Sequence, residues 1–172
     1  MRPKRSETLY NLILPVWMIF FWPSYLWLIL IPLNYLWDRI VLRWSLRDLP
    51  ERGRFCRRHT WKICLAGFLS DLLGFLLLLG FFILSEATKF GDFVESMAYY
   101  DPFSHPLAFL TVALAVLAAG FAIYFLDRLI LTKAELVPEQ AKRSALRLAL
   151  LTAPYLYFFP STVLYESGIF GL

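Results

Sequence analysis

The sequence predicts an all-α membrane protein, a four-span helical bundle in which residues 1–172 form a single integral membrane domain. Three observations predict this class. Apolar residues make up 59% of the chain, well above the roughly 45–50% of soluble domains. They gather in runs long enough to cross a bilayer, which takes about 20 residues per helix. Lys and Arg are concentrated between these runs, as the positive-inside rule expects of a membrane protein.

The N-terminal part of the chain is apolar for longer than one span requires, and several prolines interrupt it. Two layouts fit this pattern. Residues 16–42 form one kinked, tilted span, or residues 6–22 form an aromatic interfacial or re-entrant segment before a span over residues 23–43. The aromatic residues before residue 23 are typical of an interfacial belt. A basic N-terminal tail also stays cytosolic only if residues 6–22 do not cross, so we favour the second layout.

Charge divides the remaining chain into connections and spans. Residues 43–62 carry seven Lys and Arg residues against two acids, and residues 132–147 repeat this bias with four against two. Residues 85–105 reverse it, with four acids against one Lys. The positive-inside rule therefore places both basic connections in the cytosol and residues 85–105 and the C-terminus outside. The predicted spans between these connections are 61–84, 106–131 and 146–165.

Local signals refine these elements. Asp48-Leu49-Pro50-Glu51 is typical of a helix start with Asp48 as the N-cap, so we expect a short basic surface helix before span 61–84. In span 106–131, small residues form a stripe that lets another helix approach closely; it consists of Ala108, Thr111, Ala115, Ala118, Ala119 and Ala122. The last span contains Pro154 and Pro160, which predict kinks.

Two segments of the chain, residues 35–42 and 124–131, are similar and begin 89 residues apart. Tyr, Asp, Arg and Leu are identical in both, and the other four positions are apolar in both. A Pro-Glu pair follows each segment. One interpretation is two tandem related hairpins. The other is chance similarity, because tyrosine followed by charge is common where a helix leaves a membrane.

Asp71 is the most informative single residue. It lies ten residues beyond Trp61, about 15 Å into the span and near the bilayer midplane. An intramembrane carboxylate is costly and is a candidate functional group, here for a proton or cation. Asn34 and Asp38 share a helix face that extends polarity toward it. The candidate polar site comprises Asp71, Asn34, Asp38, Tyr155 and Tyr157. In the alternative interpretation, Asp71 serves packing and is hydrogen-bonded to Ser70, Thr152, Tyr155 or Tyr157.

Basic side chains at the cytosolic ends of the spans predict contacts with anionic lipid headgroups. The candidates are Arg39, Arg54, Arg57, Arg58, Arg128 and Arg143. Asp38-Arg39 and Asp127-Arg128 are interpreted as stop signals that form interhelical ion pairs, and the alternative is a cytosolic gate. Because the formal charge of +4 is concentrated at span ends, lipid is the expected partner and nucleic acid is not.

Enzymatic activity is the less favoured alternative. The sequence contains no phosphate-binding glycine loop, HExxH, GxSxG or CxxC motif. Arginines around Cys56 and His59 disfavour a metal, so neither metal nor cofactor is expected, and both cysteines are expected as free thiols. A paired-aspartate hydrolase is awkward because Asp71 lies about half a bilayer deeper than Asp38 and Asp127. A headgroup enzyme using these two aspartates and the adjacent arginines is a third class.

The sequence therefore predicts a small multi-pass protein of the cell membrane with a transport or channel-like function, for a small cation or a proton-coupled solute. Four short spans rarely enclose a path, so this function requires a homo-oligomer. The alternative is a non-catalytic accessory or scaffold subunit that binds anionic lipid. In that case the small-residue stripe within residues 108–122 docks a membrane-protein partner.

Overall fold

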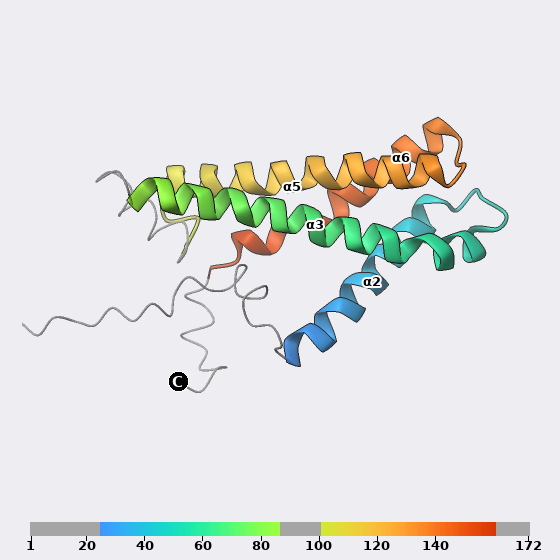
Figure 1. The fold of residues 1–172 in the computed structure, drawn as a ribbon, viewed down its shortest axis with the longest axis horizontal. Helices are drawn as coiled ribbons and strands as arrows, with labels where there is room; N and C mark the ends of the chain where they lie inside the picture. Colours follow the sequence, from blue (N-terminus) through green and yellow to red (C-terminus); the bar gives the residue numbers. More distant parts are fainter. Residues whose placement is uncertain (1–24, 87–100, 161–172) are drawn as a thin grey trace, which may run out of the picture.

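The computed structural model describes residues 25–86 and 101–160, and every regular element in these ranges is helical. The elements are α2 (Tyr25–Ser45), α3 (Arg52–Glu86), α5 (Pro106–Lys133), α6 (Pro138–Thr152) and a short 3₁₀ helix, η1 (Tyr155–Phe158). Figure 1 shows α3 and α5 side by side and antiparallel, with α2 inclined to α3. The all-α prediction is confirmed.

Two of the described helices are long and apolar enough to cross a membrane, Arg52–Leu84 of α3 and the whole of α5. In their most apolar windows only 22% and 28% of the residues are buried, whereas a core helix of a soluble protein is mostly buried. Large apolar side chains such as Leu76 and Phe121 are instead exposed, and such continuous apolar surface requires lipid or protein to cover it. The structure is thus consistent with a membrane location, but the four-span count is not confirmed.

The first hairpin follows the predicted order with shifted boundaries. α2 corresponds to the predicted span 23–43, and residues 6–22 lie outside the described residues. The prediction that Asp48 caps the next helix is wrong: α3 begins at Arg52, where the Glu51 carbonyl accepts a hydrogen bond from the Phe55 backbone N–H (3.1 Å). The predicted basic surface helix is not separate either. It forms the first turns of α3, because no proline follows Pro50 in this stretch to end it.

α5 matches its predicted span, residues 106–131, to within two residues. Its start is fixed by His105, whose Nδ1 accepts a hydrogen bond from the Leu107 N–H (3.2 Å), and by Pro106 in the first turn. Proline is favoured there because the first helical N–H groups have no intrahelical partner. Asp101 also acts locally, since its Oδ1 accepts a hydrogen bond from the Phe103 N–H (3.0 Å).

In the described part of the predicted span 146–165, the α-helix is interrupted at Pro154, where the sequence predicts a kink. α6 occupies Pro138–Thr152 and is followed by η1, so much of the predicted basic connection 132–147 is helical. The helix ends because Pro154 has no N–H for the Leu150 carbonyl. The Tyr155 hydroxyl donates to that carbonyl instead (2.7 Å), and Trp37 Nε1 of α2 donates to the next carbonyl, that of Leu151 (3.0 Å).

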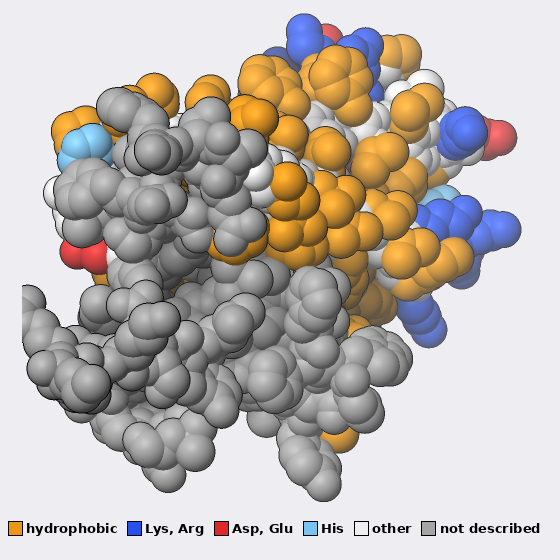
Figure 2. Space-filling model, turned by 60° about the vertical axis from the view of Figure 1, so that its left-hand side comes forward, with side chains coloured by type: hydrophobic (Ala, Val, Ile, Leu, Met, Phe, Trp, Pro, Cys, Tyr) orange, Lys and Arg blue, Asp and Glu red, His pale blue; other side chains and the backbone are white. Residues whose placement is uncertain are grey.

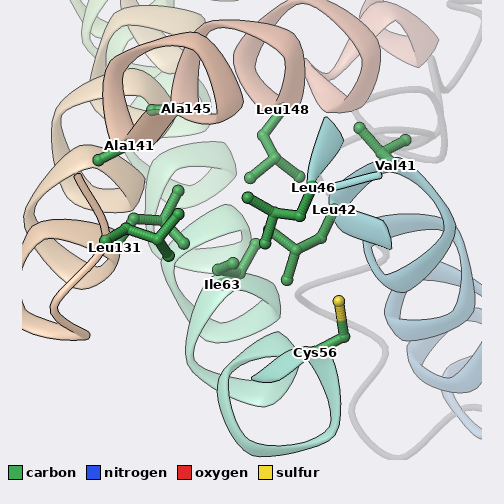
Figure 3. Packing of buried hydrophobic residues seen from close by; sticks show 10 residues of the cluster. Val41, Leu42, Leu46, Cys56, Ile63, Leu131, Ala141, Ala145 and Leu148 are labelled. Atoms are coloured by element: carbon green, nitrogen blue, oxygen red, sulfur yellow. The ribbon is translucent and has the colours of Figure 1, made fainter. Parts of the chain in front are cut away.

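All four α-helices contribute to a buried core near the two helix connections. The α2–α3 and α5–α6 turns lie at the same end of the molecule (Figure 1). Figure 3 shows the core beneath them, where Leu42 of α2, Ile63 of α3, Leu131 of α5 and Leu148 of α6 converge. We call this end, with residues 46–51 and 134–137, the basic end. Lys and Arg side chains gather there, around exposed apolar side chains (Figure 2).

Candidate functional site

Three aspartates from three different helices point into the bundle. Asp38 on α2 and Asp127 on α5 are 2% and 0% exposed, and Asp71 on α3 is half-buried. Four of their carboxyl oxygens are buried without a hydrogen-bond partner among the described residues: Asp38 Oδ2, Asp71 Oδ1 and both oxygens of Asp127. Most buried polar groups in proteins are hydrogen-bonded, so each of these oxygens requires an explanation.

The contact between α3 and α5 fixes the levels of these residues. A Cβ on Gly74 would lie 3.2 Å from the Ala115 carbonyl oxygen and 3.2 Å from the Ala119 Cβ. Because α3 and α5 are antiparallel and have the same rise per residue, residues at the same height along the bundle have numbers with a constant sum. Gly74 faces the stretch between Ala115 and Ala119, so this sum is about 191. Asp127 therefore lies level with Cys64 of α3.

Cys64 connects this level to α2. Asn34 Nδ2 of α2 donates to its Sγ (3.8 Å), and the Asp38 carboxylate lies beside the same thiol. Asp38 and Asp127 thus lie at about the same depth, and Asp71 lies two helical turns, about 10 Å, farther from the basic end.

The hydroxyl groups that could satisfy Asp71 are used elsewhere. Tyr157 donates to the backbone carbonyl of Asp71 (2.7 Å), not to its carboxylate. Ser70 and Thr152 donate to the carbonyls four residues before them (2.8 and 2.9 Å). Tyr155 is 51% exposed and donates to the carbonyl of Leu150. All four donors therefore stabilise the backbone, and Tyr155 lies at the surface rather than in the polar interior.

The arginines that follow the two buried aspartates do not pair with them. Arg39 is half-buried and Arg128 is exposed, because adjacent residues on a helix point about 100° apart. The ion pairs in the described part of the chain all lie at the surface. They join Arg47 to Asp48, Arg54 to Glu51 and Arg143 to Glu139. The expected interhelical ion pairs of Asp38 and Asp127 are therefore absent from the described residues.

The two similar segments share part of their burial pattern. Asp38 and Asp127 are buried at the fourth position, and Leu42 and Leu131 are fully buried at the eighth. The second and sixth positions are exposed in both segments. Each segment forms the end of a helix, α2 or α5, before a turn to an antiparallel neighbour.

The candidate headgroup residues differ in their freedom to bind. Arg57, Arg58 and Arg128 are exposed. Arg54 is exposed and paired with Glu51 (3.0 Å), and Arg143 is exposed and paired with Glu139 (3.7 Å).

The small-residue stripe is occupied within the chain. Ala108 and Ala119 are 0% exposed and Ala115 is 2% exposed, and Gly74 of α3 lies directly against this face. The close approach predicted from the small residues is present, but the partner helix is α3. Thr111, Ala118 and Ala122 of the stripe are half-buried, so α3 covers this face only in part.

The described residues contain no cluster of three or more His, Cys, Asp or Glu side chains that could hold a metal ion. Sequence reasoning left Asp127 and Cys64 out of the polar site. The repeated segment held the missing signal, because it places Asp127 where Asp38 stands in the first copy.

The comparisons with known proteins return no relative. No protein-family model matches the chain, and no curated protein or solved structure is similar to it at a significant level.

Proposed function

We propose that the protein is a multi-pass membrane bundle that moves protons, or a small cation, through a polar interior formed by Asp38, Asp71 and Asp127. The observation that carries this proposal is the set of four buried carboxyl oxygens without hydrogen-bond partners among the described residues. Carboxyl groups inside a membrane are typical of proton relays and ion pathways. Groups that are neither paired nor hydrogen-bonded are free to exchange a proton or to bind a cation.

The arrangement supports a stepwise path. Asp38 and Asp127 lie at one level near the basic end, and Asp71 lies about two turns deeper. We propose that a proton that enters at the basic end passes from this outer pair toward Asp71, the deeper carboxyl group.

The assembly we propose has four spans in two related hairpins, α2 with α3 and α5 with α6 and the segment that follows. The basic end faces the cytosol, as its Lys and Arg residues favour. A single chain of this size leaves little room for a path, and exposed apolar faces such as that around Leu69 and Leu76 of α3 remain available for a second copy. We therefore propose a homo-oligomer as the transporting unit.

The test is proton flux into vesicles that contain the purified protein and a trapped pH-sensitive dye. Under an imposed membrane potential we expect wild-type protein to acidify the lumen and the variants Asp71→Asn and Asp127→Asn to reduce flux to that of empty vesicles. Asp48→Asn is the matched control, because the Asp48 side chain is 81% exposed at the basic end. Equal flux for wild type and empty vesicles, under proton and alkali-cation gradients alike, would reject the proposal.

Carboxyl infrared difference spectra give an independent readout. Across about pH 5 to 9, where buried carboxyl groups titrate, we expect a titrating band that Asp71→Asn removes. A band that stays protonated throughout, in a variant that folds normally, would make Asp71 a packing residue.

The second candidate is an accessory subunit held by anionic lipid, which the exposed arginines at the basic end favour. Oligomeric state separates the two: a stable homo-oligomer supports transport, and a monomer that copurifies with another membrane protein supports the accessory role.

A further inference from the structure

An apolar groove of about 310 Å³ runs between α5 and α6 on the outer face of the bundle. Its size falls within the roughly 300–1,000 Å³ of small-molecule sites. Each wall is one face of a helix, with lining residues at the spacing i, i+3, i+4 and i+7. The α5 wall consists of Leu117, Gly120, Phe121 and Tyr124, and the opposite wall of Leu146, Ala149, Leu150 and Ala153. Val116 and Tyr155 complete the lining.

Small residues keep the groove open. A Cβ on Gly120 would meet only the Ala153 Cβ, at 3.9 Å. The rims consist of large apolar side chains, with Leu117, Phe121 and Leu150 58%, 62% and 59% exposed. A molecule that binds in this groove is therefore itself apolar. It enters from the apolar medium that surrounds the exposed rims. This excludes a polar solute and fits a hydrocarbon chain.

Basic residues extend both walls toward the basic end. Arg128 follows Tyr124 by one helical turn on α5, and Lys142 and Arg143 precede Leu146 by one turn on α6, so they continue the same helical faces. All three side chains are exposed. Glu139 pairs with Arg143 (3.7 Å), whereas Arg128 and Lys142 have no ion pair among the described residues. The groove thus leads from an apolar cleft to a rim with an excess of positive charge.

We propose that this groove binds one acyl chain of an anionic membrane phospholipid, whose phosphate is held by Arg128 and Lys142. The complementarity is twofold, because the cleft takes the hydrocarbon and the rim takes the charge. Basic pockets between helices at the cytosolic side are the usual setting for anionic headgroups. The inference requires a membrane location but not the proposed transport function. A negative result in the vesicle flux experiment therefore leaves the lipid site in place, and a negative result for lipid binding leaves the transport proposal in place.

Native mass spectrometry of the detergent-solubilised protein tests the inference, with added phosphatidylglycerol and phosphatidylcholine of identical acyl chains. We expect wild-type protein to retain phosphatidylglycerol preferentially. Arg128→Gln with Lys142→Gln removes two basic contacts, each worth about fivefold in affinity, so the preference falls by about 25-fold. Arg47→Gln with Lys62→Gln removes two exposed basic side chains from the α2–α3 hairpin and leaves the preference unchanged.

The groove itself is tested by Gly120→Leu, which fills it. We expect loss of both retained lipids. The matched control is Gly80→Leu, because a Cβ on Gly80 meets nothing within 4 Å. If Gly120→Leu does not fold, Ala153→Leu fills the groove from the opposite wall and gives the same readout.

Three results would overturn the inference. Unchanged lipid retention in a folded groove-filling variant excludes the groove. Equal retention of the two lipids by wild type excludes phosphate recognition at the rim. Lipid-free wild-type protein whose oligomer dissociates in Gly120→Leu shows that a second copy occupies the groove.

Discussion

Replacing Asp127 by alanine should make the protein more stable, which is the reverse of the normal effect at a fully buried position. Both Asp127 oxygens are buried without a partner in the part of the chain that the structure describes, and an unsatisfied buried polar group costs about 1–3 kcal/mol. Alanine removes this cost and leaves a small cavity worth about 1 kcal/mol. We therefore expect the free energy of unfolding to rise by about 1 kcal/mol.

Leu131 provides the control for this experiment. It lies one turn farther along α5, is also 0% exposed and belongs to the main core. Leu131→Ala should lower the free energy of unfolding by about 2–5 kcal/mol, as is usual for large-to-small changes in a core. The two alanine variants therefore differ in sign although their positions are equally buried.

The assay is SDS titration of the purified protein, followed by circular dichroism, with stability taken from the linear dependence on denaturant. Asp127→Ala should combine higher stability with loss of proton flux, a trade-off common where a strained or destabilised site performs the function. Equal destabilisation by Asp127→Ala and Leu131→Ala would refute the reasoning, because it would mean that the carboxyl group has a stabilising partner in the native protein.

Three other substitutions test the packing. Gly74→Leu should destabilise the α3–α5 contact by at least about 2 kcal/mol in the same titration, because a Cβ at position 74 would lie 3.2 Å from the Ala115 carbonyl oxygen. The control Gly80→Leu should change stability by less than about 0.5 kcal/mol. Glu135→Gly should raise the thermal midpoint, by about 0.5–1 kcal/mol in stability, because Glu135 has a φ of 63°; a lowered midpoint would contradict this. Trp37→Phe should lower the free energy of unfolding by about 1 kcal/mol and speed amide exchange at the end of α6, because the Leu151 carbonyl loses its donor. Unchanged exchange would show that this hydrogen bond does not hold the helix end.

The elements with local signals were predictable from the sequence. α5 was predicted to within two residues, because His105 and Pro106 mark its start and an apolar run fills its length. Its small-residue face was also recognised, and Gly74 shows why such a face matters: the α3 backbone comes within contact distance of Ala115.

Elements that depend on distant contacts were not predictable. The end of α6 is set partly by Trp37, which donates to Leu151 across 114 residues. Hydropathy along residues 146–165 contains no information about that donor. The start of α3 was also missed, because the capping signal at Asp48 competes with a turn that continues to Glu51.

The site follows the same division. The sequence identified Asp71 and Asp38 from their depth and spacing, but it assigned four hydroxyl groups as possible partners of Asp71. Each of these hydroxyl groups donates to a backbone carbonyl instead. Tyr157, for example, donates to the carbonyl of Asp71 itself. Whether a buried carboxyl group is satisfied depends on such choices between acceptors, and residue spacing does not decide them.

The two buried aspartates bear directly on the proposed function. A buried carboxyl group that only stabilised packing would be expected to use the donors around it, and a protein selected for stability alone gains by replacing it with an apolar residue. Here Asp38 lies beside Cys64, a weak donor, and Asp127 has no partner among the described residues. Burial without partners disfavours the ionised form of a carboxyl group, so such a group keeps its proton unless a cation or another proton acceptor reaches it. Under the proposed function, Asp127 is therefore the residue whose loss should reduce transport most strongly.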